Sequence, residues 1–112
     1  MTYRVILQPR AERDLLDSAR YILGQSKSPA VALRWARGIR VKIGTLKTQP
    51  LRCPIDPDSD VYGVEVRIML FGRGRGKYRV LFTIQADTVI ILTVRHSARR
   101  GVGEQSGESE DS

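Results

Sequence analysis

Three residues have side chains suited to phosphate chemistry: Arg67, Arg79 and His96. Metal-free RNA cleavage needs a cation near the phosphate, a base for the attacking 2′-hydroxyl and an acid for the leaving oxygen. Arg79 fits the first role, and His96 fits either proton-transfer role because histidine titrates near neutral pH. No second proton-transfer group is evident, since arginines hold their protons too tightly. A purely structural role for His96 at a strand end therefore stays open beside the catalytic one.

A further group of basic residues lies around the strand ends and is a candidate surface for nucleic acid or a protein target. Its members are Arg73, Arg75, Lys77, Arg95, Arg99 and Arg100. The glycine-rich run at 72–76 is similar to a phosphate-binding loop, but such loops precede a helix and this run lies between two predicted strands. We therefore predict a hairpin turn that carries mobile positive charge.

The sequence predicts neither a metal site nor a cofactor. Asp56, Asp58 and Asp60 have the spacing that begins a calcium-binding loop. The loop would require glycine and glutamate where this chain has Val61 and Arg67. We therefore interpret the three aspartates as loop residues.

Hydrophobic periodicity predicts an α+β fold. Apolar residues recur at helical spacing after Pro9 and again after Ser28-Pro29, and they alternate in the segments that follow. A short connection between two helices favours an antiparallel hairpin, which should pack on one face of a single sheet. We predict a strand at 2–7, helices at 9–23 and 29–46, a loop at 48–60, and an antiparallel meander with strands at 61–71, 78–85 and 89–94.

The expected register brings the candidate residues together. Pairing the apolar faces sets Arg79 opposite Met69 and diagonal to Arg67, and in the last hairpin opposite Val94 and diagonal to His96. Arg67, Arg79 and His96 are then expected to converge on the sheet face away from the helices. A slip of one residue would move a whole strand's side chains to the other face.

Charge is unevenly distributed along the chain. The 112 residues include 19 Lys and Arg, 12 Asp and Glu, and 41% apolar residues, with a net charge of +7. Residues 1–103 carry +11 and residues 104–112 carry −4. We expect one folded domain at 1–100, which should attract polyanions or an acidic protein, and a disordered acidic tail at 101–112. With no membrane segment, no signal peptide and only one cysteine, Cys53, we expect a cytoplasmic protein.

The motifs and their order resemble toxins of the RelE/ParE superfamily, from bacterial type II toxin–antitoxin modules. The resemblance covers roughly 3–100 and rests on YRVILQPRAERDLLDSARYI, AVALRWARGI, KYRVLFTI and VIILTVRHSARR. It implies a small sheet with an N-terminal helical hairpin, an acidic antitoxin as partner, and growth arrest as the outcome. The antitoxin is expected to bind through an amphipathic helix or an added strand.

The superfamily has two mechanisms. RelE-like members cleave messenger RNA on the ribosome; the arginine of their Tyr-Arg motif matches Arg79, and a histidine that several of them use corresponds to His96. ParE-like members inhibit DNA gyrase without catalytic residues. The long hairpin with Trp35 and the VRHSARR ending are more similar to ParE, and residues 64–66 lack the lysines of RelE. Trp35 itself either widens the core or lies at a partner interface.

Our first hypothesis is thus a ParE-like toxin that inhibits DNA gyrase and is neutralised by a cognate, acidic antitoxin. The alternative is a ribosome-dependent, metal-independent endoribonuclease that acts on messenger RNA, so whether the chain is an enzyme stays open. A third hypothesis is a non-toxic, basic nucleic-acid-binding module.

Overall fold

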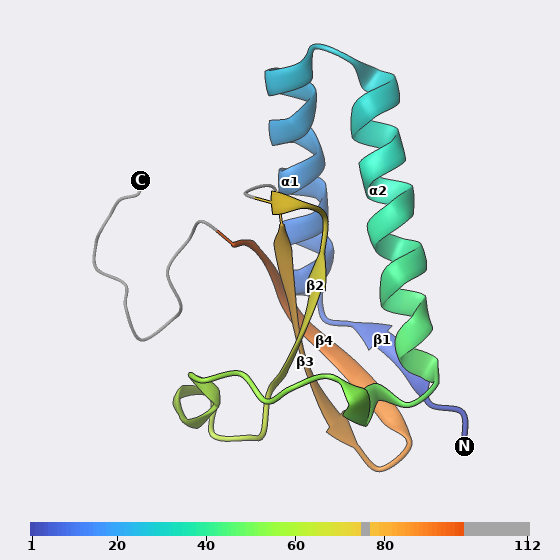
Figure 1. Ribbon diagram of the computed structural model, residues 1–112, viewed down its shortest axis with the longest axis vertical. Helices are drawn as coiled ribbons and strands as arrows, with labels where there is room; N and C mark the ends of the chain where they lie inside the picture. Colours follow the sequence, from blue (N-terminus) through green and yellow to red (C-terminus); the bar gives the residue numbers. More distant parts are fainter. Residues whose placement is uncertain (75–76, 98–112) are drawn as a thin grey trace.

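Strands and helices follow one another as the hydrophobic periodicity predicts. The computed structural model describes residues 1–74 and 77–97. The α+β class is confirmed: one strand, a helical hairpin, then three strands, with both helices on one face of the sheet (Figure 1). None of the helices in these residues is both long and apolar enough to cross a membrane. The elements are β1 (Arg4–Leu7), α1 (Pro9–Ser26), α2 (Pro29–Gly44), β2 (Arg67–Phe71), β3 (Tyr78–Gln85) and β4 (Thr88–His96), with 3-10 turns η1 (Thr45–Lys47), η2 (Pro50–Arg52) and η3 (Ser59–Tyr62).

The helix ends have local causes. Pro29 occupies the first turn of α2, where its missing N–H costs nothing, and the Ser28 hydroxyl accepts a hydrogen bond from the Val31 N–H at 3.3 Å. Helix α1 continues past Gly24, where we expected it to end, because one internal glycine weakens a helix by only about 1 kcal/mol. It stops at Lys27, which adopts the left-handed conformation.

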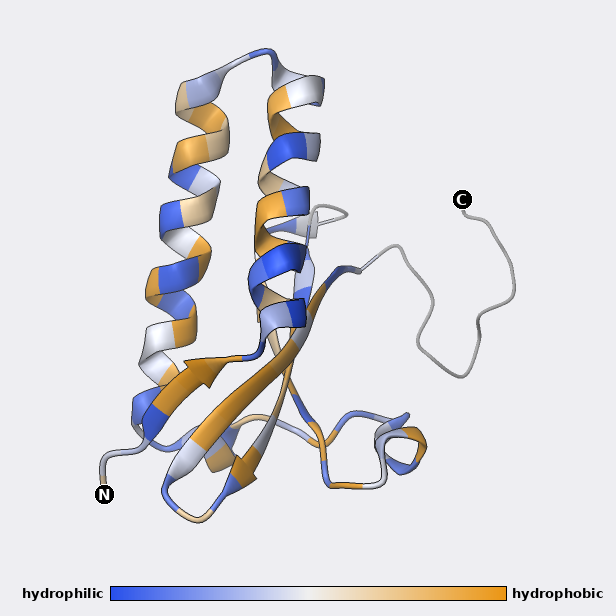
Figure 2. Cartoon of the chain, turned by 180° about the vertical axis from the view of Figure 1, so that it is seen from behind, coloured by the Kyte–Doolittle hydropathy of each residue, from blue (hydrophilic) through white to orange (hydrophobic). Residues whose placement is uncertain are grey.

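The sheet has the strand order β1-β4-β3-β2. β1 pairs with β4 in parallel and the other two pairs are antiparallel, so β4 is a central strand, as its apolar residues on both faces predict. Figure 2 shows hydrophobic residues along most of β1 and β4, whereas polar and apolar residues alternate on the helices. The core lies between this sheet and the helical hairpin, and its largest fully buried side chains are Phe82, Ile39, Leu46, Ile91, Val80 and Val89.

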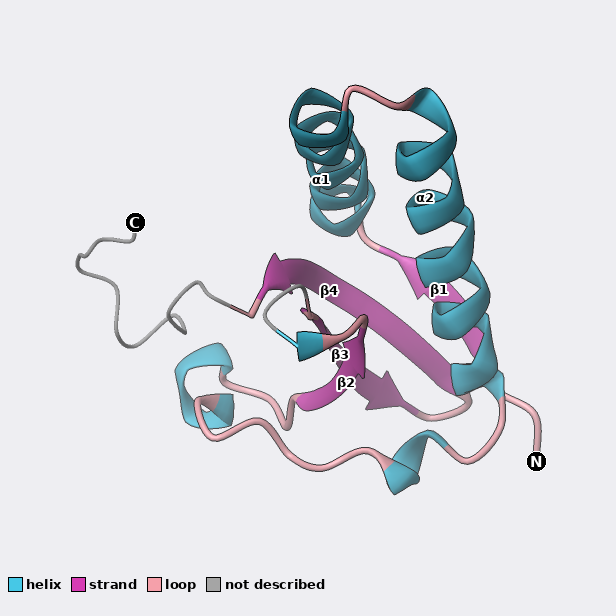
Figure 3. Cartoon of the chain, turned by 45° about the horizontal axis from the view of Figure 1, so that its top comes forward, coloured by secondary structure: helices cyan, strands magenta, loops and turns pink. Residues whose placement is uncertain are grey.

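The face away from the helices is also covered, by the long connection between α2 and β2 (Figure 3). Thr83, which is 6% exposed, donates a hydrogen bond to the carbonyl oxygen of Glu65 at 2.8 Å. The Ser59 hydroxyl accepts from the N–H of the fully buried Val66 at 2.7 Å. Residues 54–66 therefore form a second layer on the sheet, and the loop predicted at 48–60 is an ordered part of the fold.

The strand predicted at 61–71 is shorter than expected and its register differs by one residue. It begins at Arg67, because Gly63 with φ of 74° ends the turn η3 and interrupts the extended run. Met69 pairs with Val80, so Arg79 lies opposite Leu70 and not opposite Met69. Met69 is 6% exposed and Leu70 is 48% exposed, the reverse of the predicted pattern.

A carboxylate from α1 occupies part of the edge of β4. β1 ends at Leu7, while β4 continues beyond their last pair and would expose backbone there. Asp14 Oδ2 accepts hydrogen bonds from the Thr93 hydroxyl at 2.5 Å and from the Val94 N–H at 3.0 Å. Since Thr93 and Val94 are both buried, these bonds fix α1 against the sheet.

We expect Asp14→Ala to lower the free energy of unfolding by about 2–4 kcal/mol, because two partly buried donors lose a charged acceptor. Denaturant unfolding followed by circular dichroism measures the change. Asp17→Ala is the matched control, since Asp17 is exposed and contacts Arg20 only at 3.9 Å, and it should shift stability by no more than about 0.5 kcal/mol. Equal losses in the two variants would show that the Asp14 bonds do not hold α1 in place.

Candidate functional site

The three residues suited to phosphate chemistry do not converge, so the predicted site geometry is wrong. Directly paired residues share a face of the sheet. Arg67 pairs with Phe82 and His96 pairs with Tyr78, which places both on the helix-facing side. Arg79 lies on the opposite face, where it pairs with Arg95, and not with Val94 as expected.

Arg67 is held within the fold. Its side chain is 16% exposed, and Nη1 donates a hydrogen bond to the Cys53 carbonyl oxygen at 2.6 Å. Nη2 forms an ion pair with Glu65 at 3.2 Å. These contacts fasten the connection between α2 and β2 to the first residue of β2. The Arg67 guanidinium thus binds the connection between α2 and β2, where Cys53 and Glu65 lie.

His96 lies at the end of a series of aromatic rings. Its ring is 5.0 Å from the ring of Tyr78 in an edge-to-face arrangement, and Tyr78 is 4.8 Å from Trp35. Trp35 also meets Phe71, with ring centres 6.5 Å apart. Of the two interpretations of Trp35, the structure supports the first: it widens the core face of α2. Gly38 permits this packing, since a Cβ there would lie 3.0 Å from the Phe71 ring.

Arg79 and Arg95 form a cross-strand pair that belongs to a mixed polar cluster. Like charges directly opposite one another in a sheet repel. Tyr62 of η3 lies near both arginines and near Asp56. Burial is the main influence on the Tyr62 hydroxyl and raises its pKa, against the opposing effect of Arg95, so this hydroxyl keeps its proton at neutral pH. The cluster therefore contains cations and a weak acid, but it gains no base from Tyr62.

Sequence reasoning missed Tyr62 and did not predict that the loop residue Asp56 is buried, because a proline-rich connection gives no periodicity from which to place a side chain. The only available signal was the unusual length of that connection. Long ordered loops frequently carry functional or covering segments.

Part of the predicted basic surface gathers at one end of the sheet. Arg73 and Lys77 flank the β2–β3 turn, and the Lys77 carbonyl accepts from the Ser97 N–H at 2.7 Å just after β4. Arg95 is in the same region, two residues before Ser97. Arg75, Arg99 and Arg100, together with the predicted tail, lie outside the described residues. We call Arg73, Lys77, Arg79 and Arg95 the basic end of the sheet.

The described residues offer neither a metal-binding cluster nor a reactive thiol. They contain no group of three or more His, Cys, Asp or Glu side chains placed to share a metal ion. Cys53 is buried, and this burial raises its thiol pKa despite the nearby Arg52. The thiol is therefore protonated at neutral pH, which makes it a poor nucleophile.

Comparisons with known proteins agree with this fold. The family model described as "ParE toxin of type II toxin-antitoxin system, parDE" matches residues 5–101. A chain from the chromosomal ParDE toxin–antitoxin system of P. aeruginosa is 18% identical with a TM-score of 0.68, covering 85% of this chain and 96% of that one. A chain from the RelBE2 complex of Mycobacterium tuberculosis is 25% identical with a TM-score of 0.47, covering 86% and 99%. No curated protein matches.

The contacts of Arg67 predict a structural role that can be measured. Arg67→Met keeps much of the side-chain volume but loses the bonds to Cys53 and Glu65, so the free energy of unfolding should fall by about 1–3 kcal/mol. Arg73→Met, at an exposed position, should change it by no more than about 0.5 kcal/mol. Thermal and denaturant unfolding test both variants. Unchanged stability in Arg67→Met would contradict a structural role for the Arg67 guanidinium.

Proposed function

We propose that this chain, which belongs to the ParE toxin family of type II toxin–antitoxin systems, arrests bacterial growth by inhibiting DNA gyrase. The observation that carries the proposal is the separation of Arg79 from His96 on opposite faces of the sheet. An inhibitor that acts by binding needs a complementary surface, and it does not need a base, an acid and a cation around one phosphate.

The surroundings of His96 and Arg79 favour a toxin that binds its target over one that cleaves RNA. His96 packs its ring against Tyr78, which is 5% exposed and belongs to the core. Arg79 shares its surroundings with Tyr62 and Asp56, so neighbouring acidic charge weakens the positive field that a phosphate would meet. Within residues 1–74 and 77–97, Arg79 and His96 therefore do not face one common site.

The basic end of the sheet is the surface that we propose for the target. Arg73, Lys77 and Arg95 lie around the β2–β3 turn and the end of β4, within a chain of net charge +7. Positive charge of this kind accelerates encounter with an acidic protein surface or with DNA held by an enzyme. An exposed turn between two strands also presents its side chains on a rigid support.

The experiment is induction of the native chain in bacteria, followed by three measurements on the same culture. We expect covalent gyrase–DNA complexes to accumulate, a DNA-damage reporter to respond, and message ends mapped at nucleotide resolution to remain unchanged. His96→Ala separates the hypotheses, since a binding inhibitor needs no proton transfer. His96→Ala should therefore retain toxicity. Asp17→Ala, on the far helix, is the control for expression.

Two other outcomes would count against gyrase inhibition. Codon-phased message cuts that disappear in His96→Ala and Arg79→Ala, without gyrase complexes, would establish the endoribonuclease; the Tyr-Arg pair at 78–79 is the feature that favours it. Harmless expression without an antitoxin would instead support a nucleic-acid-binding module.

A further inference from the structure

Three of the four cations at the basic end of the sheet have no acidic partner in the described residues. There, no acidic side chain is in ion-pair contact with Arg73, Lys77 or Arg95. Elsewhere the fold pairs its cations, as Arg40 does with Glu12 at 2.8 Å. Arg73 is exposed, and Lys77 and Arg95 are partly exposed. This end of the sheet therefore presents accessible positive charge that no ion pair in the described part of the fold neutralises.

The chain leaves the sheet at this same place. β4 ends at His96, and the next residue, Ser97, donates a backbone hydrogen bond to the Lys77 carbonyl oxygen at 2.7 Å. Ser97 is the last described residue and follows Arg95 by two positions. The sequence beyond Ser97 therefore begins its path within the basic end.

The sequence that follows carries the opposite charge. Residues 104–112, which we call the acidic segment, contain no basic residue and have a net charge of −4, against +11 for residues 1–103. The acidic segment lies outside the described residues. At about 0.1 M salt, opposite charges attract one another over about 10 Å. Its acidic residues are Glu104, Glu108, Glu110 and Asp111.

The length of the connection favours a contact at the basic end over one at the opposite end of the sheet. Glu104 is the seventh residue after Ser97, and seven residues span at most about 25 Å. Strand β4 itself rises about 26 Å from Thr88 to His96. A carboxylate at position 104 thus approaches the β3–β4 turn only near full extension, whereas the basic end is within reach of every compact path.

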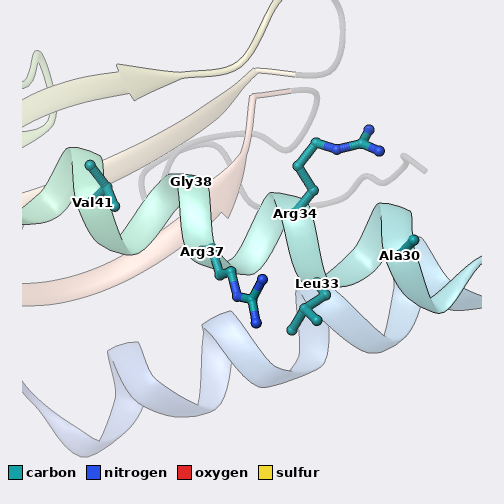
Figure 4. Close-up of a pocket in the computed structure, with 6 residues that line it drawn as sticks. All are labelled: Ala30, Leu33, Arg34, Arg37, Gly38 and Val41. Atoms are coloured by element: carbon teal, nitrogen blue, oxygen red, sulfur yellow. The ribbon is translucent and has the colours of Figure 1, made fainter.

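The helical hairpin also carries cations, but they diverge. A hollow of about 570 Å³ along α2 is lined by Arg34 and Arg37 and includes Val41, which is 72% exposed. Figure 4 shows Arg34 extending to one side of α2 and Arg37 to the other. A second hollow, of about 310 Å³ between α1 and α2, has a largely apolar lining that includes Leu23 and Leu33. Neither hollow gathers several cations on one side, as a segment with several carboxylates would require.

We propose that the acidic segment binds the basic end of the sheet in the same chain and competes there with the target. Its carboxylates contact Arg73, Lys77 and Arg95 in place of the acidic groups or phosphates of that target. The contact does not depend on what the target is. Its effect on toxicity rests on the proposed inhibition of gyrase, which we assign to the same surface.

The expected contact is weak and can be displaced. Ion pairs between exposed side chains contribute little on their own. A short connection, however, makes the binding intramolecular, with an effective concentration in the millimolar range. A target that offers more negative charge, or apolar contacts as well, displaces the segment. The acidic segment therefore slows engagement of the target without preventing it.

The first test detects the contact by NMR in the full-length chain. A nitroxide spin label on Ser109→Cys should broaden the amide signals of the basic end at low salt, and leave those of residues 86–88, at the opposite end of the sheet, sharp. About 1 M salt, at which the Debye length is about 3 Å, should reduce the broadening. The native chain is the labelling control, because its one cysteine, Cys53, is buried.

A second labelled chain separates attraction from mere proximity, since the connection alone keeps the label near the basic end. It has the same length, and its broadening should be weaker by at least about twofold. It carries Glu104→Gln, Glu108→Gln, Glu110→Gln and Asp111→Asn.

Two charge reversals locate the contact. Lys77→Glu should weaken the broadening as the neutral segment does. Arg4→Glu changes the net charge equally at the opposite end of the sheet, where Arg4 pairs with Thr88, and should leave the broadening unchanged. Equal broadening by the charged and the neutral segment would overturn the proposal, as would equal effects of the two reversals.

Mixed samples distinguish a contact within one chain from a contact between two copies. A spin-labelled chain is added to an isotope-labelled chain that carries no spin label. We expect no broadening in the isotope-labelled chain. Broadening as strong as in the singly prepared sample would assign the acidic segment to a second copy and overturn the proposal.

The competition is measured with a short DNA duplex as a polyanionic probe at low salt. Glu108→Gln combined with Glu110→Gln should tighten binding by about threefold. Asp17→Asn combined with Asp87→Asn raises the net charge equally, at exposed positions outside the basic end, and should change affinity by less than about 1.5-fold. Equal gains in both double variants, or no gain in either, would overturn the competition. Gyrase enters none of these measurements, so failure of this contact and failure of gyrase inhibition are observed separately.

Discussion

Burial of the sheet on both faces is the constraint on which the rest of the structure depends. The helical hairpin covers one face and residues 54–66 cover part of the other, so Val66 and Met69 are both buried although they lie on opposite sides of the chain. A polar side chain on β2 or β3 must then find partners inside the fold. Arg67 does so through the Cys53 carbonyl, and Arg79 lies beside the cluster that contains Tyr62.

The same constraint explains how far the sequence could predict the fold. Strand 78–85 was predicted with its observed ends, because apolar side chains recur at every second position from Tyr78 to Ile84. The register of β2 could not be predicted, since residues 68–71 are all apolar and alternation there does not mark the core side. A slip of one residue in the β2–β3 pair separated Arg67 from Arg79, and the shifted register of the β3–β4 pair beyond the irregularity at Leu81/Phe82 separated His96.

Of the candidate binding surfaces, the sequence identified the charged one and missed the apolar one. Sequence identified Arg95 and the cations around the turn as a basic surface, because charge depends on residue type alone. It could not identify the apolar hollow between α1 and α2, since Leu23 and Leu33 look like ordinary helix residues until the neighbouring helix is placed. Leu23 fits the apolar stripe of α1 by spacing, yet the hairpin turns it toward solvent.

The basic residues that make up the net positive charge therefore have different roles. Arg40 and Arg67 are compensated by Glu12 and Glu65 and hold elements of the fold together. Arg34 and Arg37 lie on α2 next to exposed apolar side chains such as Val41. Long-range attraction comes from the sum of all these charges, but it carries no specificity. Specificity requires charges that the fold holds beside apolar side chains, and on α2 the cations Arg34 and Arg37 lie beside the exposed Val41.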